Sequence, residues 1–179
     1  MPASNSTTGG GLGKVRPGEK AYPYIILYNG KLYMVRNVGD TTPTTNLRGE
    51  VWTCTPNASG QCAPAGWSKI ISGTETDIGS TATAIGMLIA NGNNLYLGFD
   101  DPVSGVRVFK FSGTTPSATS GTMSGAGWVQ QGTNGLGSNS KYIMTSVSLY
   151  DQITNKNYIY IAIGNGLGTT AIKVVRQVD

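Results

Sequence analysis

Residues 24–37, YIILYNGKLYMVRN, form a pattern that returns twice in the chain, as GMLIANGNNLYLGFDD (86–101) and SVSLYDQITNKNYIYIAIGNG (146–166). Each version is an apolar run, a turn and a second apolar run that carries an aliphatic residue followed by tyrosine. In the first two versions the turn contains Asn-Gly, a strong signal for a β-hairpin, because both residues readily adopt positive φ. A longer turn replaces this pair in the third version. The chain is therefore expected to contain three equivalent hairpins.

Two more strands are expected after each hairpin. A third apolar strand is predicted at GEVWTCT (49–55), VRVFKFS (106–112) and IKVVRQV (172–178), and Gly-Trp marks a fourth strand in GWSKI (66–70) and GWVQQ (127–131). The third repeat has no such Gly-Trp strand. No helical periodicity exceeds one turn, so the sequence predicts an all-β protein of three four-stranded antiparallel repeats.

The repeats divide the chain at regular intervals. The hairpin tyrosines recur about every 63 residues, which is longer than the ~40–50 residues of common propeller repeats. The repeats are predicted at about residues 8–72, 73–131 and 132–179. Residues 1–13 are interpreted as a stalk-like or linker segment, and residues 14–179 as a single all-β domain.

The second strand of each hairpin is an almost continuous apolar run, which indicates that both of its faces are covered. Four-stranded sheets packed face to face, like the blades of a β-propeller, provide that environment, whereas a two-sheet sandwich leaves one face of each sheet in water. The hairpin with its tyrosine and the late Gly-Trp resemble β-propeller repeat proteins of the kelch and bacterial lectin kind. The kelch double glycine after the second strand is missing. The composition is also similar to that of receptor-binding tips of phage tail fibres and of bacterial trimeric fibre adhesins.

Ionisable side chains are scarce in this chain. Charged residues make up 12% of it, and histidine is absent. The lack of histidine removes the commonest general base and the commonest metal ligand, and no cofactor or metal is predicted. The net charge of +4 comes from Lys and Arg residues scattered singly, so nucleic acid is not an expected partner. No apolar stretch reaches the roughly 18 residues of a membrane span, so membrane insertion is not expected either.

The two cysteines, Cys54 and Cys62, bracket the turn-forming stretch TPNASGQ. Two thiols without histidine cannot complete a zinc site, so a disulfide that closes this hairpin-sized loop is the favoured prediction. Two unpaired thiols are the alternative. A disulfide implies an oxidising compartment, and the expected location is extracellular or at a cell surface, with any export signal outside this chain.

The nine carboxylates do not indicate an active site. A glycoside hydrolase needs two carboxylates held at a fixed separation on rigid walls, and most of those in this chain fall in predicted turns. The glycine-rich runs lack the Lys-Ser/Thr ending of a phosphate-binding loop. The protein is therefore not expected to be an enzyme, and a glycan hydrolase is kept only as a third hypothesis.

Polar loops are the expected binding surface. In a propeller, the loops from strand two to three and from strand four to one gather on one face, and loops on rigid scaffolds often carry function. These loops are rich in Asn, Asp, Ser and Thr, which hydrogen-bond sugar hydroxyls but also simply form turns. Tryptophan stacks on sugar rings, although equivalent positions in two repeats favour a structural role for both tryptophans. The candidate ligand-binding residues are Asn37, Asp40, Asp100, Asp101, Asn134, Asn165, Trp67 and Trp128.

These features predict an extracellular adhesion or recognition module whose partner is a cell-surface glycan or an envelope receptor. The alternative is a structural fibre-tip or assembly unit whose loops contact copies of itself. Three sheets are fewer than the about 4–8 blades of closed propellers, so one chain is expected to leave sheet edges and apolar end faces exposed. A homo-oligomer, either a dimer or a trimer, is therefore predicted.

Overall fold

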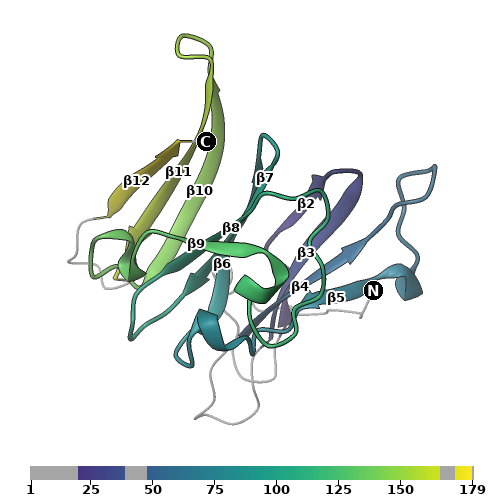
Figure 1. The fold of residues 1–179 in the computed structure, drawn as a ribbon, viewed down its shortest axis with the longest axis horizontal. Helices are drawn as coiled ribbons and strands as arrows, with labels where there is room; N and C mark the ends of the chain where they lie inside the picture. Colours follow the sequence, from purple (N-terminus) through teal and green to yellow (C-terminus); the bar gives the residue numbers. More distant parts are fainter. Residues whose placement is uncertain (1–19, 39–47, 166–171, 179) are drawn as a thin grey trace.

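The computed structural model describes residues 20–38, 48–165 and 172–178 (Figure 1). The first repeat forms sheet A, with strands β1 (Lys20–Ala21), β2 (Ile25–Tyr28), β3 (Lys31–Val38), β4 (Arg48–Cys54) and β5 (Ser68–Ile71). β1 and β2 pair with the same edge of β3, β1 at its end and β2 at its start. Sheet A is therefore a four-stranded antiparallel meander whose first strand is interrupted.

The second and third repeats form two further antiparallel meanders. Sheet B consists of β6 (Ala84–Asn91), β7 (Asn94–Asp100), β8 (Arg107–Phe111) and β9 (Trp128–Gln131). Sheet C consists of β10 (Tyr142–Asp151), β11 (Lys156–Gly164) and β12 (Lys173–Val178). Four short 3-10 turns lie between strands: η1 (Pro64–Gly66), η2 (Thr76–Ile78), η3 (Ser124–Ala126) and η4 (Asn134–Leu136).

This strand order confirms the all-β prediction and the three sheet-forming repeats. Sheets A and B contain the four expected strands in chain order, and sheet C has three within the described residues. The first hairpin turns at Asn29 and Gly30, with φ of 46° and 74°, as the Asn-Gly pair predicts. In the second hairpin Asn91 pairs with Asn94, so the turn is one residue later than the Asn-Gly pair indicates and begins with Gly92. All three sheets are open in the described part of the chain, and no closed propeller is observed there.

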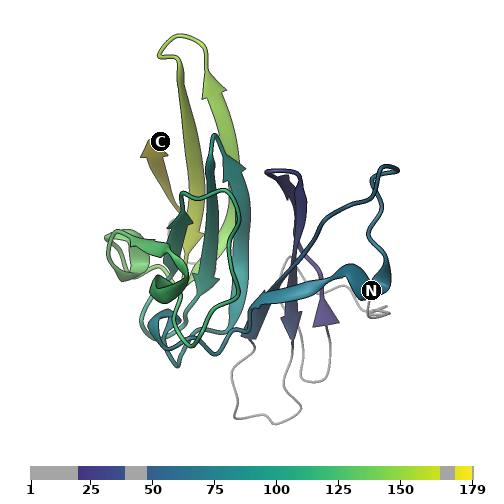
Figure 2. The same cartoon turned by 45° about the vertical axis from the view of Figure 1, so that its right-hand side comes forward.

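The three sheets are stacked in chain order, with sheet B between sheets A and C (Figures 1 and 2). β6 contacts β2, β3 and β4 on one side and β10 and β11 on the other. Alternate residues of β7 therefore point into two different hydrophobic cores: Leu95 and Leu97 into the core with sheet A, and Tyr96 into the core with sheet C. The prediction that the second strand is covered on both faces is confirmed for this repeat.

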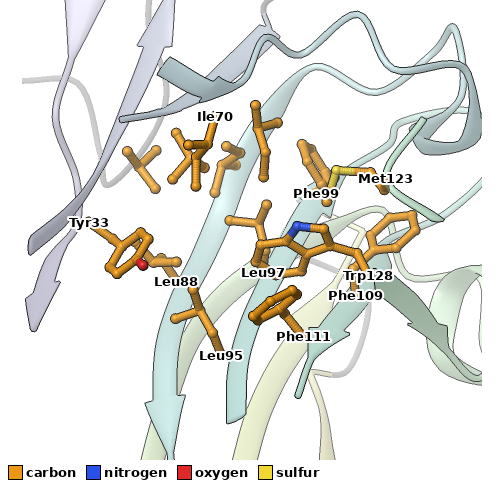
Figure 3. Close-up of a cluster of buried hydrophobic side chains, with 14 of the residues drawn as sticks. Tyr33, Ile70, Leu88, Leu95, Leu97, Phe99, Phe109, Phe111, Met123 and Trp128 are labelled. Carbon is orange, nitrogen blue, oxygen red and sulfur yellow. The ribbon is translucent and has the colours of Figure 1, made fainter. Parts of the chain in front are cut away.

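The core between sheets A and B is rich in aromatic side chains (Figure 3). Tyr33 of β3 lies on one side, and Leu97 and Phe109 of sheet B lie on the other. Trp128 is only 1% exposed, and its ring centroid lies 5.4 Å from that of Phe111. Full burial of one large apolar side chain stabilises a fold by about 1.5–3 kcal/mol, so this core holds sheets A and B together as one unit.

The core between sheets B and C is mainly aliphatic. Ile143 of β10 and Ile159 and Ile161 of β11 pack with Val108 of sheet B. Gly98 of β7 allows this close approach, because a Cβ atom there would lie 2.4 Å from Cδ1 of Ile143. The isoleucine side chain therefore occupies the space that a side chain at position 98 would need.

Each sheet uses its two faces in the same way. We call the face that carries the repeat tyrosine (Tyr33, Tyr96 or Tyr160) the front face, and the opposite one the back face. Tyr33 lies in the core between sheets A and B, and Tyr96 lies in the core between sheets B and C. Leu95 and Ile159 each precede their tyrosine by one residue, and they face these same two cores from the back of sheets B and C. The front face of one sheet thus packs on the back face of the next.

Candidate functional site at the loop face

The loops expected to carry binding residues lie together at one end of the sheets, toward the bottom of Figure 1. We call residues 72–83, 100–105 and 131–141 the loop face. Two further loops were expected to belong to it. These are the loops at residues 37–48 and 164–170. Most of each loop falls in residues 39–47 and 166–171, which lie outside the described residues.

Hydrogen bonds connect these loops to one another. The backbone N–H of Val106 donates to the carbonyl of Ser140 at 3.0 Å, and the N–H of Gly135 donates to the carbonyl of Val106 at 2.8 Å. The hydroxyl of Thr81 donates to the carboxylate of Asp101 at 2.8 Å. The loop face is therefore one connected surface, built by the second repeat and the links on either side of it.

Asp101 organises the turn at residues 101–105. Its side chain is 0% exposed and accepts the backbone N–H groups of Val103 at 3.0 Å and Ser104 at 2.7 Å. The guanidinium of Arg107 lies 3.6 Å from the same carboxylate and compensates its charge. The carboxylate also accepts the hydrogen bond from Thr81, so all of these partners belong to the protein itself. Its role is therefore to hold the loop face together.

Asn37 and Asp100 occupy equivalent positions at the ends of β3 and β7, and both bind the first strand of the next sheet. Nδ2 of Asn37 donates to the carbonyl of Ile85 at 3.0 Å, and the N–H of Ile85 donates back to Oδ1 at 2.9 Å. The N–H of Ile143 donates to Oδ1 of Asp100 at 2.8 Å. Gly164 is the equivalent residue of sheet C and has no side chain to offer. These two predicted binding residues therefore connect neighbouring sheets.

The structure does not bring the other predicted site residues together. Asn134 is exposed on the loop face, and its Oδ1 accepts a hydrogen bond from a neighbouring glutamine at 3.0 Å. Asn165 follows β11, and its Oδ1 is buried without a hydrogen-bond partner in the described part of the chain. Trp67 is half-buried just before β5, and Trp128 lies in the core between sheets A and B. Asp40 lies outside the described residues.

Glu75 and Asp77 anchor the link between sheets A and B. Burial raises the pKa of Glu75, but hydrogen bonds from Thr119 and Ser72 outweigh this effect and leave the pKa below its ordinary value. The same balance lowers the pKa of Asp77, whose carboxylate accepts the N–H of Met123 at 2.7 Å. Both groups are therefore ionised at neutral pH. A catalytic acid needs a raised pKa, so neither carboxylate is prepared for that role.

A charged cluster that the sequence analysis missed lies on the back face of sheet A. Glu50 accepts hydrogen bonds from Nε of Arg36 at 2.7 Å and from the indole N–H of Trp52 at 2.8 Å, and Nζ of Lys69 lies 3.4 Å away. The guanidinium carbon of Arg36 lies 5.2 Å from the centroid of the Trp52 ring. We call these four residues the Glu50 cluster. Only the pairing of β3, β4 and β5 brings them together, and that register could not be read from the sequence.

Cys54 and Cys62 form a disulfide, as favoured from the sequence. The bond closes the loop after β4, at the opposite end of sheet A from the link to sheet B. Within this loop Oδ1 of Asn57 accepts the N–H groups of Ser59 at 3.0 Å and Gln61 at 2.9 Å. The loop is thus fixed by a covalent bond and by an internal turn.

A small apolar pocket lies between sheets B and C. Its walls include Tyr96 and Val108 from sheet B and Ile161 and Val175 from sheet C. Val175 is the repeat equivalent of Phe109, which fills the corresponding region between sheets A and B. The valine side chain, which is smaller than that of phenylalanine, forms part of the pocket wall at this position.

In the described ranges, no three Asp, Glu, Cys or His side chains lie close enough together to bind a metal ion. Within the same residues, the structure contains no helix whose length and apolar character would allow it to cross a membrane. Comparisons of the chain with protein-family models, with curated proteins and with solved structures found no match.

Proposed function

We propose that the protein is an extracellular adhesion or recognition module that binds cell-surface glycans through its loop face and has no catalytic role. The observation that carries this proposal is the connected loop face, which internal hydrogen bonds hold in place while short polar side chains remain exposed on it. Its exposed hydroxyl and amide side chains are Thr74, Thr76, Ser80, Ser104, Thr133, Asn134 and Asn139.

A fixed polar surface suits glycan recognition for a physical reason. Sugar hydroxyls both donate and accept hydrogen bonds, and Ser, Thr and Asn side chains do the same. Groups that are already held in place lose little conformational entropy on binding. In this proposal the stacked sheets are propeller-like blades that carry the loops, and the disulfide suits an oxidising, extracellular compartment.

The test is a screen of the protein against an array of surface glycans, followed by calorimetry on the hits. Asn134→Ala and Asn139→Ala are each expected to weaken binding about fivefold, because one hydrogen bond contributes about 1 kcal/mol. Gln152→Ala is the matched control, since this exposed amide lies on the hairpin at the opposite end of sheet C. No binding to any surface glycan or envelope extract would contradict the proposal, as would equal losses in all three variants.

The second hypothesis is a structural assembly unit without its own ligand. The observation that favours it is the exposure of apolar residues on the front face of sheet C, where Val147 is 45% and Val174 is 62% exposed. If the loops make the contacts between copies, as predicted from the sequence, Asn134→Ala and Asn139→Ala weaken assembly; if the apolar face makes them, these two variants leave assembly unchanged. In that second case, substitutions on the apolar face abolish assembly.

A further inference from the structure

The three front faces carry the same apolar set, with one residue from the first strand, the tyrosine from the second and a valine from the third. The three sets are Ile26, Tyr33 and Val51 in sheet A; Ile89, Tyr96 and Val108 in sheet B; and Val147, Tyr160 and Val174 in sheet C. The first set packs against the back face of sheet B, and the second packs against the back face of sheet C. The chain thus makes the same front-to-back contact twice.

The two valines of the third set are exposed to solvent, whereas Tyr160 is half-buried. Val147 is 45% exposed and Val174 is 62% exposed, and Leu149, farther along β10, is 50% exposed. The equivalent valines in the other sheets, Val51 and Val108, are 0% and 2% exposed. The front face of sheet C therefore has the same kind of apolar residues that pack against a neighbouring sheet in sheets A and B. On sheet C, however, no sheet of the described structure covers them.

The back face of sheet A is exposed in a matching way. Ile25 and Leu27 on β2 are 56% and 62% exposed. Their repeat equivalents in sheet B are Leu88 and Ala90, which pack in the core with sheet A. The apolar character of these positions is thus retained in sheet A, on the face that also carries the buried Met34 and the Glu50 cluster.

We propose that the front face of sheet C binds the back face of sheet A in a second copy of the chain. The chain already contains two examples of this contact, and its two end faces retain the apolar residues of the outer strand positions. They differ at the Glu50 cluster, where Arg36 takes the place of Phe99 in sheet B and Ile163 in sheet C. A second copy repeats the contact in both directions, which buries both end faces of both chains. This proposal is independent of any glycan that the loop face binds.

The number of sheets favours two chains. A front-to-back contact joins two different faces, so it is heterologous. Repeated contacts of this kind form a closed ring when the rotations between successive sheets add up to a full circle. Closed propellers contain about 4–8 blades, so two chains with six sheets lie in this range, whereas three chains with nine sheets do not. The assembly is therefore a two-fold symmetric ring of six sheets.

Light scattering over a wide range of protein concentrations tests the ring. The expected molar mass is twice the 18.7 kDa of one chain. Leu27→Glu on the back of sheet A and Val174→Glu on the front of sheet C are each expected to give monomers, because each buries a charge in both interfaces. Val129→Glu is the matched control, since Val129 is also 62% exposed but lies on β9 of the central sheet. This control should remain dimeric.

Mixing the two monomeric variants distinguishes a head-to-tail ring from other dimers. One interface of the mixed pair then joins two unmodified faces, so dimers are expected to return. A parent protein with the mass of one or three chains overturns the proposal. So does a Leu27→Glu variant that stays dimeric, which would indicate pairing of two sheet C faces. If either glutamate variant lacks the parent circular dichroism spectrum, Ile25→Lys and Val147→Lys replace the pair, and failure of their mixture to dimerise overturns the ring.

Discussion

At the scale of single residues, buried polar side chains decide how the loops are held. Asp101, Asn37 and Asp100 are each at most 9% exposed. Asp101 accepts N–H groups of its own turn, whereas Asn37 and Asp100 each accept a backbone N–H from the next sheet. In the sequence these residues stand at strand ends among turn-forming residues, where ligand-binding residues also occur. Burial distinguishes the two roles, because a buried acceptor that binds backbone N–H groups stabilises the loop itself.

Replacement of Asp101 tests this structural role. Asp101→Ala leaves the N–H groups of Val103 and Ser104 and the charge of Arg107 without their buried partner. The free energy of unfolding is expected to fall by about 3 kcal/mol, measured by chemical denaturation. Asp151→Ala is the control. Like Asp101, Asp151 accepts the backbone N–H of the residue two positions later, but it does so on an exposed hairpin. Similar losses in both variants would show that burial is not the cause.

At the scale of elements, the two sheet interfaces differ in the size of the side chain at one equivalent position. Phe109 of β8 packs edge-on against Phe99 at 5.9 Å in the core between sheets A and B. Val175 of β12 is the equivalent residue between sheets B and C, and it lines the apolar pocket there. The interface of the three-stranded sheet therefore has a smaller side chain at this position, beside a pocket.

Filling this pocket is expected to stabilise the protein. Val175→Phe introduces the side chain that the equivalent position already holds, so the free energy of unfolding should rise by about 1 kcal/mol. Val174→Phe is the matched control. Val174 directly precedes Val175, but its side chain points to the exposed front face of sheet C. Thermal unfolding of both variants compares the two positions. A loss of stability in Val175→Phe would mean that the pocket cannot accept a ring without strain.

At the scale of the whole molecule, the order of stacking determines which sheet is best protected. Sheet B has a hydrophobic core on each face, whereas sheets A and C each have one in the described structure. Opening sheet B requires the disruption of both cores, while sheets A and C can open from their outer faces. Local stability is therefore expected to decrease from the centre of the stack outward.

Hydrogen exchange measured by mass spectrometry tests this order. The amides of β7 are expected to exchange most slowly, because the strand is paired on both edges and packed on both faces. The amides of β2 and β12, at the edges of sheets A and C, are expected to exchange fastest among the strands. Equal protection of β7 and β12 would contradict a stability order that is set by two-sided burial.

Much of the architecture could be predicted because it depends on local patterns. The alternation of apolar runs and turns located the hairpins, and the recurrence of Tyr33, Tyr96 and Tyr160 located the repeats. The candidate site was harder to predict, since Asn, Asp, Ser and Thr favour turns whether or not they bind a ligand. The Glu50 cluster escaped prediction because its four residues come from three strands whose register depends on long-range pairing.

The sequence alone therefore determined the all-β class, the three repeats, the order of their strands and the pair of cysteines that forms the disulfide. These features depend on side-chain periodicity and on the φ preferences of turn residues, which act over a few neighbouring positions. Only the tertiary structure decided which face of each sheet meets the next one. It also decided that Asn37 and Asp100 connect sheets, and that Val174 remains exposed while its repeat equivalents, Val51 and Val108, are buried. The physical reason is that burial belongs to the packing of whole sheets, so identical local patterns acquire different environments according to their place in the stack.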